Sequence, residues 1–385
     1  MTTDSAASHP RLAIASGIFH PEPGGPATYL RELLPELQAR GWDIRALTFS
    51  DSPQPQGEPY PVTRIVRQSY PLRMARYAAA SRPLMAWADL VYVHLLGLPL
   101  LGRRRAKRVI KIVGDLAWER AVRRGWIAPD EDIDAYQTRR YGQAANADRA
   151  RLAREARTYD GVIVPSAYLK RMVVGWGVPE DRVRVIYNAL PPELHVPSVS
   201  QAEARAQLGL PSGPLVLTVG RVLPWKGVDH LITALAGAPD VQLAVAGDGP
   251  ALPAAQAQAA ASPASQRVTF LGRVARDQMA LYMRAADYVA LYSGYEGLSH
   301  ALLESLRVGT PVIASDKGGN PEVVEHGVNG LLVPYVSVDA LAETLRDAFT
   351  PGRREALAAQ HEHRIERFAY ARLIEQTDAA LREYL

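Results

Sequence analysis

The sequence of 385 residues contains no cysteine, few aromatic residues and no long uninterrupted apolar run. Without cysteine the chain has neither disulfide bonds nor thiolate metal sites, although this absence does not select a cellular compartment. The longest apolar stretch, Leu90 to Leu101, contains His94 and Pro99 and is shorter than the roughly 20 residues that span a bilayer. No basic and then apolar leader opens the chain, so the sequence predicts a cytoplasmic protein.

The net charge is small, but the charges are unevenly distributed. Residues 1–190 hold 28 Lys and Arg against 19 Asp and Glu, whereas the remaining residues hold 16 against 21. Basic clusters at Arg103-Arg104-Arg105 and Arg123-Arg124 lie in the first half. Two interpretations stay open: a solvated arginine-rich surface, or a face that meets anionic lipid or an anionic acceptor. No nucleic-acid recognition module accompanies these charges, so no nucleic-acid partner is expected.

Apolar strand patterns alternate with helical patterns along two successive halves of the chain, whose length suggests two domains. The first half has strand patterns at 11–15, 44–49, 89–95, 108–113, 160–165 and 182–187, with helical patterns at 26–41, 133–158 and 167–174. The second has strand patterns at 215–219, 241–246, 268–271, 288–291, 311–314 and 331–333, and closes on helical patterns at 338–348, 354–364 and 370–385. This alternation predicts an α/β protein with two doubly wound parallel sheets joined by a linker at 188–200.

Residues 293–315 carry the densest group of candidate functional residues. A loop with Glu296 follows an apolar strand, and a helix that begins near Ser299 carries Glu304 and ends at Gly309. Free N–H groups at such a helix start suit a phosphate or another anion. If the segment were all helical, the two glutamates would lie roughly 12 Å apart, beyond the roughly 5–9.5 Å used for glycoside hydrolysis. We therefore expect separate roles for them.

Two cations follow the strand at 215–219. Arg221 and Lys226 are bracketed by glycines, and a guanidinium fork with a compact ammonium group suits a diphosphate. Considered alone, this loop could equally hold two exposed basic residues. The carboxyl ends of parallel strands are where open α/β sheets bind ligands, which favours a site.

The segment from Glu296 to Glu304, EGLSHALLE, resembles the E-x7-E signature of retaining glycosyltransferases of family 4, which have the GT-B fold. The resemblance covers residues 11–380, and its other motifs occur in the order of that family. They are Pro23-Gly24-Gly25, Ile186-Tyr187-Asn188, Gly220-Arg221 with Lys226-Gly227, Ala246 to Pro250, Phe270-Leu271-Gly272, and Gly318-Gly319 with Pro321-Glu322.

The resemblance implies a GT-B fold, with two Rossmann-like doubly wound domains facing across a cleft. Residues 1–190 would form the acceptor domain and 191–367 the nucleotide-sugar donor domain, while a helix at about 368–385 would pack back on the first domain. The implied reaction is retaining transfer of a sugar from a UDP- or GDP-linked donor to a hydroxyl acceptor, in cell-envelope glycan, glycolipid or small-glycoside biosynthesis. No cofactor and no metal are expected.

The resemblance also assigns roles around the donor. Arg221 and Lys226 would hold the diphosphate, Glu296 would contact the transferred sugar and Glu304 would accept hydrogen bonds from the ribose. The other donor-binding residues would contribute mainly backbone, and they are Gly25, Val274, Gly297, Leu298 and Ser299.

The acceptor side of the site is less fully defined. Many relatives have a histidine after the strand at 108–113, where this chain has Gly114 followed by Asp115. Asp115 is a candidate for catalysis or acceptor binding, with a buried turn aspartate as the alternative. His94 is a second acceptor candidate, with a core histidine as the alternative. The acceptor would be a small molecule, a glycan or a lipid-linked molecule, and the basic first half suggests peripheral membrane association. Two other functions stay open: a nucleotide-sugar epimerase and a non-catalytic nucleotide or carbohydrate binder.

Overall fold

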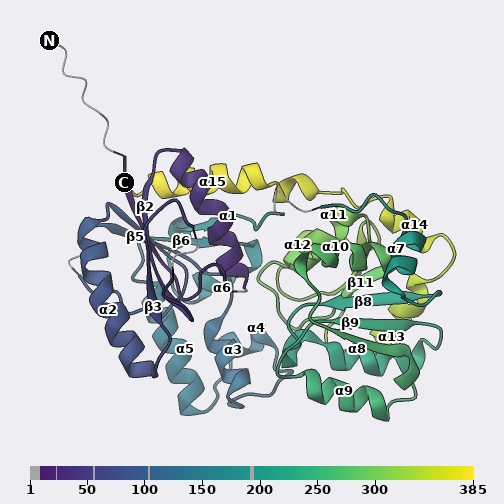
Figure 1. Ribbon diagram of the computed structural model, residues 1–385. Coiled ribbons are helices and arrows are strands. Elements are labelled where there is room, and N and C mark those ends of the chain that lie inside the picture. Colours follow the sequence, from purple (N-terminus) through teal and green to yellow (C-terminus); the bar gives the residue numbers. More distant parts are fainter. Residues whose placement is uncertain (1–8, 23, 55–56, 103–104, 191–194) are drawn as a thin grey trace.

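The computed structural model describes residues 9–22, 24–54, 57–102, 105–190 and 195–385, which form two lobes (Figure 1). The first lobe holds a seven-stranded sheet of order β3-β2-β1-β4-β5-β6-β7, and the second a six-stranded sheet of order β10-β9-β8-β11-β12-β13. Neighbouring strands run parallel in both sheets. The prediction of two doubly wound parallel sheets is confirmed. Pro23, Arg103, Arg104 and 191–194 of the linker lie outside the described residues.

The strands of the first lobe are β1 (Arg11–Ala15), β2 (Asp43–Ser50), β3 (Val62–Val66), β4 (Leu90–Val93), β5 (Lys107–Lys111), β6 (Gly161–Val164) and β7 (Val183–Val185). Its helices are α1 (Gly25–Ala39), α2 (Tyr70–Trp87), α3 (Leu116–Arg123), α4 (Ile133–Thr138), α5 (Gln143–Ala156) and α6 (Ala167–Gly175). The predicted apolar face of α1 is confirmed, since its leucines 30, 33, 34 and 37 are fully buried.

Three differences from the predicted elements have physical reasons. The sequence did not predict β3 or α2, because β3 is a half-buried edge strand and α2 contains an internal proline, Pro83, with only three buried side chains. The single helical stretch predicted at 133–158 was wrong. Arg139 adopts an extended conformation and Gly142 precedes a new helix, so α4 and α5 are separate.

The second lobe contains six strands among the described residues, and all lie within one residue of their predicted bounds. They are β8 (Leu215–Val219), β9 (Gln242–Ala246), β10 (Val268–Gly272), β11 (Tyr288–Leu291), β12 (Val312–Ser315) and β13 (Gly330–Val333). Its helices are α7 (Gln201–Leu208), α8 (Val228–Ala234), α9 (Leu252–Ala261), α10 (Arg276–Ala285), α11 (His300–Val308), α12 (Asn320–Val323), α13 (Val338–Ala348) and α14 (Arg353–Ala358). The helix predicted at 354–364 is wrong beyond Ala358, where turns follow.

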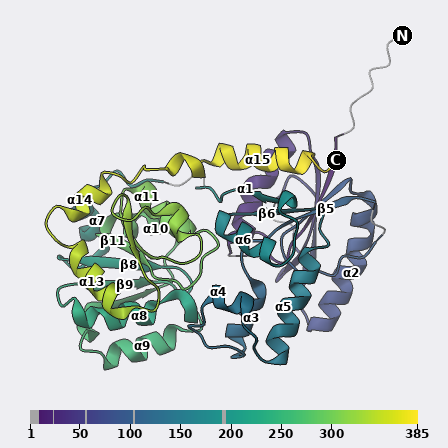
Figure 2. The same ribbon diagram turned by 180° about the vertical axis from the view of Figure 1, so that it is seen from behind.

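The last helix, α15 (Tyr370–Arg382), runs from the second lobe back onto the first (Figures 1 and 2). The indole Nε1 of Trp42 donates to Asp378 Oδ1 at 2.6 Å, and the hydroxyl of Tyr370 donates to the carbonyl of Glu32 at 2.7 Å. Leu373 and Leu381 are buried in the same apolar cluster as the leucines of α1. The chain therefore crosses between the lobes twice.

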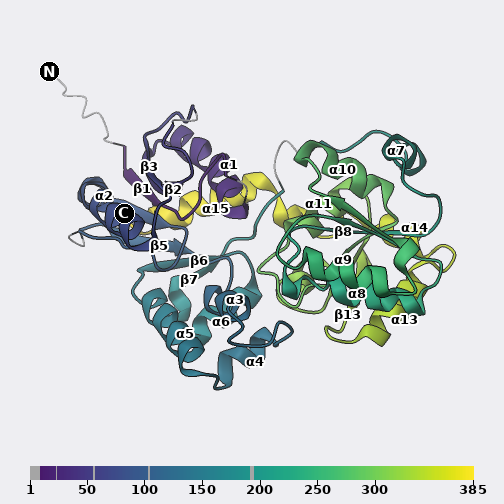
Figure 3. The same ribbon diagram turned by 60° about the horizontal axis from the view of Figure 1, so that its bottom comes forward.

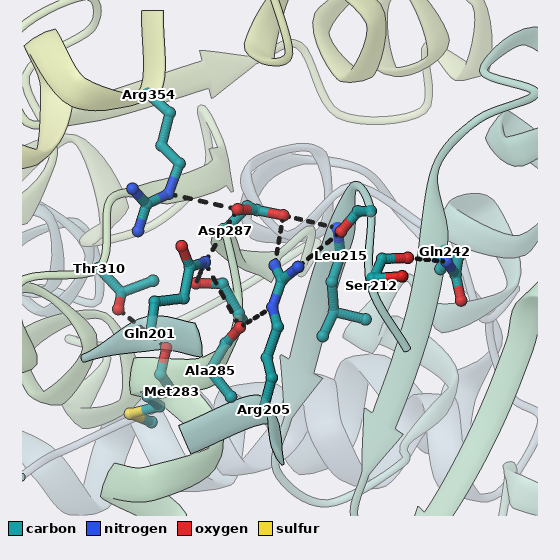
Figure 4. A network of polar contacts seen from close by, with 12 residues as sticks. Gln201, Arg205, Ser212, Leu215, Gln242, Met283, Ala285, Asp287, Thr310 and Arg354 are labelled. Carbon is teal, nitrogen blue, oxygen red and sulfur yellow. Dashed lines mark hydrogen bonds and ion pairs between the residues drawn. The ribbon is translucent and has the colours of Figure 1, made fainter. Parts of the chain in front are cut away.

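Asp287 organises the edge of the second sheet at which β8 and β11 begin (Figure 4). Its Oδ2 accepts hydrogen bonds from the backbone N–H of Leu215 at 2.8 Å and from Arg205 at 2.7 Å. Its Oδ1 accepts from Gln201 at 2.9 Å and lies 3.4 Å from Nε of Arg354. One carboxylate thus ties α7 and α14 to the sheet, at the edge opposite the carboxyl ends of the strands.

No helix in the described ranges combines the length and the apolar character that crossing a membrane requires.

Candidate active site

Lys226 and Glu296 meet at the carboxyl edge of the second sheet. Lys226 ends η2 (Pro224–Lys226), a single 3₁₀ turn that follows β8, and Glu296 lies in the loop after β11. Neighbouring strands β8 and β11 are the point where the order of the sheet reverses, the usual ligand-binding crevice of such sheets. Nζ of Lys226 lies 2.5 Å from Oε1 of Glu296, and both side chains keep some exposure, at 21% and 14%.

Glycines allow these loops to pack on one another. A Cβ at Gly227 would lie 1.9 Å from the carbonyl oxygen of Tyr292, and one at Gly318 would lie 2.3 Å from that of Glu296. The N–H of Gly294 donates to Trp225 at 2.8 Å, and that of Gly319 to Glu296 at 2.8 Å. Larger residues would separate the backbones, so the glycines set the shape of the site.

The predicted bounds of α11, near Ser299 and at Gly309, are confirmed. The hydroxyl of Ser299 accepts the N–H of Leu302 at 3.4 Å, and Gly309 ends the helix in the left-handed conformation. The backbone N–H groups of Gly297, Leu298 and Ser299 donate no hydrogen bond to another residue that the structure describes. Free donors at a helix start favour an anionic ligand.

The remaining predicted donor residues surround this loop. Arg221 is exposed and has no ion pair with any described residue. Gly25, the first residue of α1, faces open space, because a Cβ there would meet nothing within 4 Å. Val274 is half-buried just beyond β10. Glu304 faces the first lobe, and burial raises its pKa. The charge of Arg276 acts to lower this pKa and that of Glu32 acts to raise it.

Asp115 is the N-cap of α3. Its Oδ1 accepts the N–H groups of Ala117 and Trp118 at 2.9 and 3.0 Å, and its Oδ2 accepts Nε2 of Gln137 at 2.9 Å. The side chain is buried, which raises its pKa despite these hydrogen bonds. Both carboxylate oxygens have protein partners, an arrangement that favours the structural alternative. Its catalytic or acceptor role stays a prediction.

His94 follows β4 and lies in a buried aromatic cluster. Its ring centroid is 4.2 Å from that of Tyr92 and 5.6 Å from that of Tyr29, and its Nε2 has no hydrogen-bond partner among the described residues. Lys111, at the end of β5, points its Nζ at the ring of Tyr29, 3.6 Å from the centroid. Burial lowers the pKa of Lys111 to about 7 and, together with Lys111, keeps the pKa of His94 well below its usual value.

The two lobes contact each other around this site. In Figures 1 and 3, α3, α4 and α6 lie on the side of the first lobe nearer the second. Nζ of Lys317 lies 2.5 Å from Oδ2 of Asp132. Glu322 accepts the backbone N–H groups of Ala167 and Tyr168, which open α6, at 2.9 and 2.8 Å. The second lobe thereby caps a helix of the first.

Gly297 shows how closely the lobes approach. A Cβ at this position would lie 2.2 Å from the carbonyl oxygen of Val113, which belongs to the first lobe. Arg276 of α10 also reaches across, with contacts of 3.4 Å to both Thr28 and Glu32 of α1. The predicted donor residue Gly297 therefore lies against the chain after β5, and Arg276 of the same lobe reaches the start of α1.

Within the described ranges, no three His, Asp or Glu side chains gather as a metal site would require. The two cations predicted to hold the diphosphate are Arg221 and Lys226. Both line a small cavity at the carboxyl ends of β8 and β9.

Two family descriptions match the two lobes. Glycosyltransferase Family 4 matches residues 23–194, and Glycosyl transferases group 1 matches residues 200–368. A curated relative, the D-inositol 3-phosphate glycosyltransferase of Mycobacterium sp. (strain JLS), is 35% identical over 209 residues, which are 50% of this chain and 48% of the relative. The chain thus spans about half the length of the curated relatives it matches.

Solved glycosyltransferase structures share the whole architecture. Sucrose-phosphate synthase from Thermosynechococcus elongatus superimposes with a TM-score of 0.78 at 24% identity, covering 97% of this chain and 98% of that one. Anabaena HepE in complex with UDP-glucose gives 0.77 at 22% identity, covering 97% and 100%. The fold is therefore the GT-B fold. The shared fold and the two family matches together support the identification of this protein as a GT-B glycosyltransferase.

The sequence did not single out several residues that the fold brings to the site. Glu119 lies one helical turn after Asp115, and that four-residue spacing on a helix that follows a strand end was the available signal. Lys111 and His300 were also missed. Burial, with Lys111 and Arg276 nearby, lowers the pKa of His300 to about 4. A basic residue ending an apolar strand is the only sequence sign of Lys111.

Proposed function

We propose that this protein is a retaining glycosyltransferase that moves a sugar from a UDP- or GDP-linked donor to a hydroxyl acceptor. The contact between Lys226 and Glu296, beside the free N–H groups at the start of α11, is the observation that carries the proposal. A cation and a helix start suit the departing diphosphate, while a carboxylate suits the sugar hydroxyls. The same site argues against a pure binder, which has less need of all these groups.

The residues perform the proposed reaction by positioning and charge. Arg221 and Lys226 stabilise the diphosphate as the bond between it and the anomeric carbon breaks, Glu296 orients the sugar and Glu304 holds the ribose. The acceptor oxygen bonds to the anomeric carbon on the same face, and its proton passes to the departing phosphate oxygen. No protein nucleophile and no metal take part in this scheme.

A pocket in the first lobe supports an anionic acceptor. It has a volume of about 780 Å³, within the usual size of a ligand site, and its mainly apolar walls include the end of β2 and the loop after β4. Five arginines line it: Arg67, Arg73, Arg120, Arg124 and Arg151. Asp148 is the one acid in its described lining, and it pairs with two of them. Arg73 and Arg124 have no ion pair with a described residue. The relative named for D-inositol 3-phosphate makes phosphorylated cyclitols sensible trial acceptors.

The decisive experiment is a donor panel. Thermal shift with UDP, GDP and ADP identifies the base, since a bound ligand raises the melting temperature. The matching nucleotide sugars are then incubated with and without inositol phosphates, hexoses and lipid phosphates, and nucleoside diphosphate release is measured. Release with an acceptor-linked product of unchanged anomeric configuration supports the proposal. Binding without turnover supports a binder, and an altered sugar on an intact donor supports an epimerase.

The proposal includes a cytoplasmic location with peripheral attachment to the inner face of a membrane. The excess of basic residues in the first half supports this attachment. Co-sedimentation with vesicles of anionic and of neutral lipid at low salt tests it, and equal binding to both would contradict it.

A further inference from the structure

Three aromatic side chains meet where α3 of the first lobe packs against the second. The ring centroid of Trp118 lies 5.2 Å from that of Trp225 and 5.7 Å from that of Tyr295. All three side chains are buried. Trp225 belongs to the turn after β8 and Tyr295 to the loop after β11. The rings therefore hold α3 against the two loops that carry the proposed donor residues.

Each of these aromatic residues is followed in the chain by a charged one. Lys226 and Glu296 come after Trp225 and Tyr295, and Glu119 comes after Trp118. Because packing of the rings fixes three short backbone segments, the charged residues emerge along one seam between the lobes. The pKa of Glu119 reflects this, since burial raises it and the charges of both Lys226 and Glu296 act on it.

Gly114 leaves room for the Glu119 carboxylate beside this seam. A Cβ at Gly114 would lie 3.2 Å from Oε1 of Glu119 and 3.1 Å from the hydroxyl of Tyr295. The carboxylate therefore lies over the chain just beyond β5, at the ligand-binding edge of the first sheet. Its oxygens have no hydrogen bond or ion pair with any residue in the described ranges. A half-buried carboxylate without a protein partner favours a polar ligand.

We propose that Glu119 positions the acceptor, with its carboxylate accepting a hydrogen bond from the hydroxyl that attacks the donor sugar. This inference rests on the proposed function. Glu119 projects from the acceptor lobe toward Lys226 and Glu296 of the donor lobe, so a hydroxyl held by it lies next to the sugar held by Glu296. Glu119 takes no proton in the reaction, because the proton passes to the departing phosphate.

The charged groups that face Glu119 set its pH response. Asp115 and Arg123 face it from α3, and Lys226 and Glu296 face it from the second lobe. Burial and the two acids outweigh the two cations, so the pKa of Glu119 lies above that of an ordinary glutamate. Transfer then falls with decreasing pH as Glu119 gains a proton and no longer accepts from the hydroxyl.

The test compares Glu119→Gln with the wild type and with Glu36→Gln, an exposed position on α1. Titration with the nucleotide identified by thermal shift gives the nucleotide Kd. The matching nucleotide sugar is then used to measure the rates of transfer to the active acceptor of the panel and to water. We expect Glu119→Gln to retain the nucleotide Kd within twofold and to lose at least tenfold in transfer. We also expect the acidic limb of its pH profile to disappear. Gly114→Ala, which crowds the carboxylate, should show a smaller loss, and Glu36→Gln should behave as the wild type.

Two results would overturn this inference while leaving the proposed function intact. One is wild-type transfer and an unchanged acidic limb in Glu119→Gln. The other is an equal loss of nucleotide affinity and of transfer, which would mean that Glu119 supports the donor site or the fold. A wild-type protein that releases no nucleoside diphosphate from any donor would overturn both proposals.

Discussion

Nζ of Lys226 lies 2.5 Å from Oε1 of Glu296, although 70 positions separate the two residues in the chain. The contact arises because β8 and β11 are adjacent parallel strands, so the loops after them share one edge of the sheet. A bound diphosphate would offer Lys226 a stronger anionic partner. We expect Glu296 then to turn to the hydroxyls of the donor sugar.

Replacing Lys226 by alanine should reduce turnover by about 100- to 1000-fold, because removing one group that stabilises developing charge has an effect of this size. The fold should persist, since Lys226 keeps partial exposure. Steady-state rates and circular dichroism measure both effects. Arg307→Ala, an exposed cation in the last turn of α11, is the control. A folded Lys226→Ala protein with wild-type kcat/KM would refute the role.

Gly297→Ala should prevent the lobes from closing fully. Its Cβ would lie 2.2 Å from the carbonyl oxygen of Val113, and a backbone atom cannot move aside as a flexible side chain can. We expect nucleotide binding to persist while transfer falls at least tenfold. With donor bound, small-angle X-ray scattering should show a larger radius of gyration for Gly297→Ala than for the wild type. Gly142→Ala, with nothing within 4 Å of the added Cβ, provides the comparison, and identical scattering from both variants would disprove the steric block.

Removing the Glu322 carboxylate should destabilise the contact between the lobes. It accepts two N–H groups at the start of α6 and a third hydrogen bond from the hydroxyl of Tyr187 at 3.0 Å. Glu322→Ala should lower the free energy of unfolding by about 2 kcal/mol, the usual range for hydrogen bonds to a charged group. Urea denaturation measures the change against Glu343→Ala, an exposed change on α13. Equal stabilities would show that the cap contributes nothing.

Lys111 should make stability depend on pH. Its pKa is lowered by burial to about 7 from 10.5, so between these values the unfolded chain binds a proton that the folded chain does not. Stability therefore rises with pH from about 7 toward 10.5, and each unit of pKa shift corresponds to about 1.4 kcal/mol. Lys111→Met should flatten this rise and stabilise the protein below pH 7. Denaturation at a series of pH values tests this, and an unchanged slope in the variant would exclude Lys111 as its source.

Asp287→Asn should lower the stability of the protein without changing nucleotide binding. The side chain has two arginine partners and is only 13% exposed, so leaving those cations with a neutral amide should cost about 3 kcal/mol of folding free energy. The network drawn in Figure 4 lies where β8 begins, whereas Lys226 follows the end of β8, so the nucleotide Kd should not change. Thermal denaturation and nucleotide titration measure the two quantities. A large loss of affinity in the folded variant would contradict this separation.

The sequence predicted the strands that are apolar runs, including the half-buried edge strand β10, and it missed β3, whose five residues include Thr63 and Arg64. The strands from β8 to β13 are short apolar runs, so their bounds followed from composition alone. The sequence of edge strand β3 shows no clear apolar face, and the strand forms by pairing with β2. Likewise Ser299 and Gly309 marked the ends of α11, because a capping hydroxyl and a left-handed glycine act locally.

The site was predictable only as separate loops. Lys226 and Glu296 were each identified, but their contact depends on strand order, which no local pattern contains. Glu119 enters the site only because Trp118 packs against the other lobe. The Asp115 carboxylate caps α3, a role that an aspartate just before a helix often has. Position in the sequence alone does not show whether an acidic residue after a strand caps a helix, as Asp115 does, or reaches the site, as Glu119 does.

The two segments that cross between the lobes also touch each other. The N–H of Leu190 donates to the carbonyl of Phe368 at 3.2 Å, and Arg367 donates to the hydroxyl of Tyr187 at 2.6 Å. Because the two crossings lie side by side and are hydrogen-bonded to each other, we expect the lobes to open by rotation about this pair of segments. Atom pairs far from the crossings would then separate more than atom pairs close to them. Acceptor entry and product exit would both use this opening of the lobes.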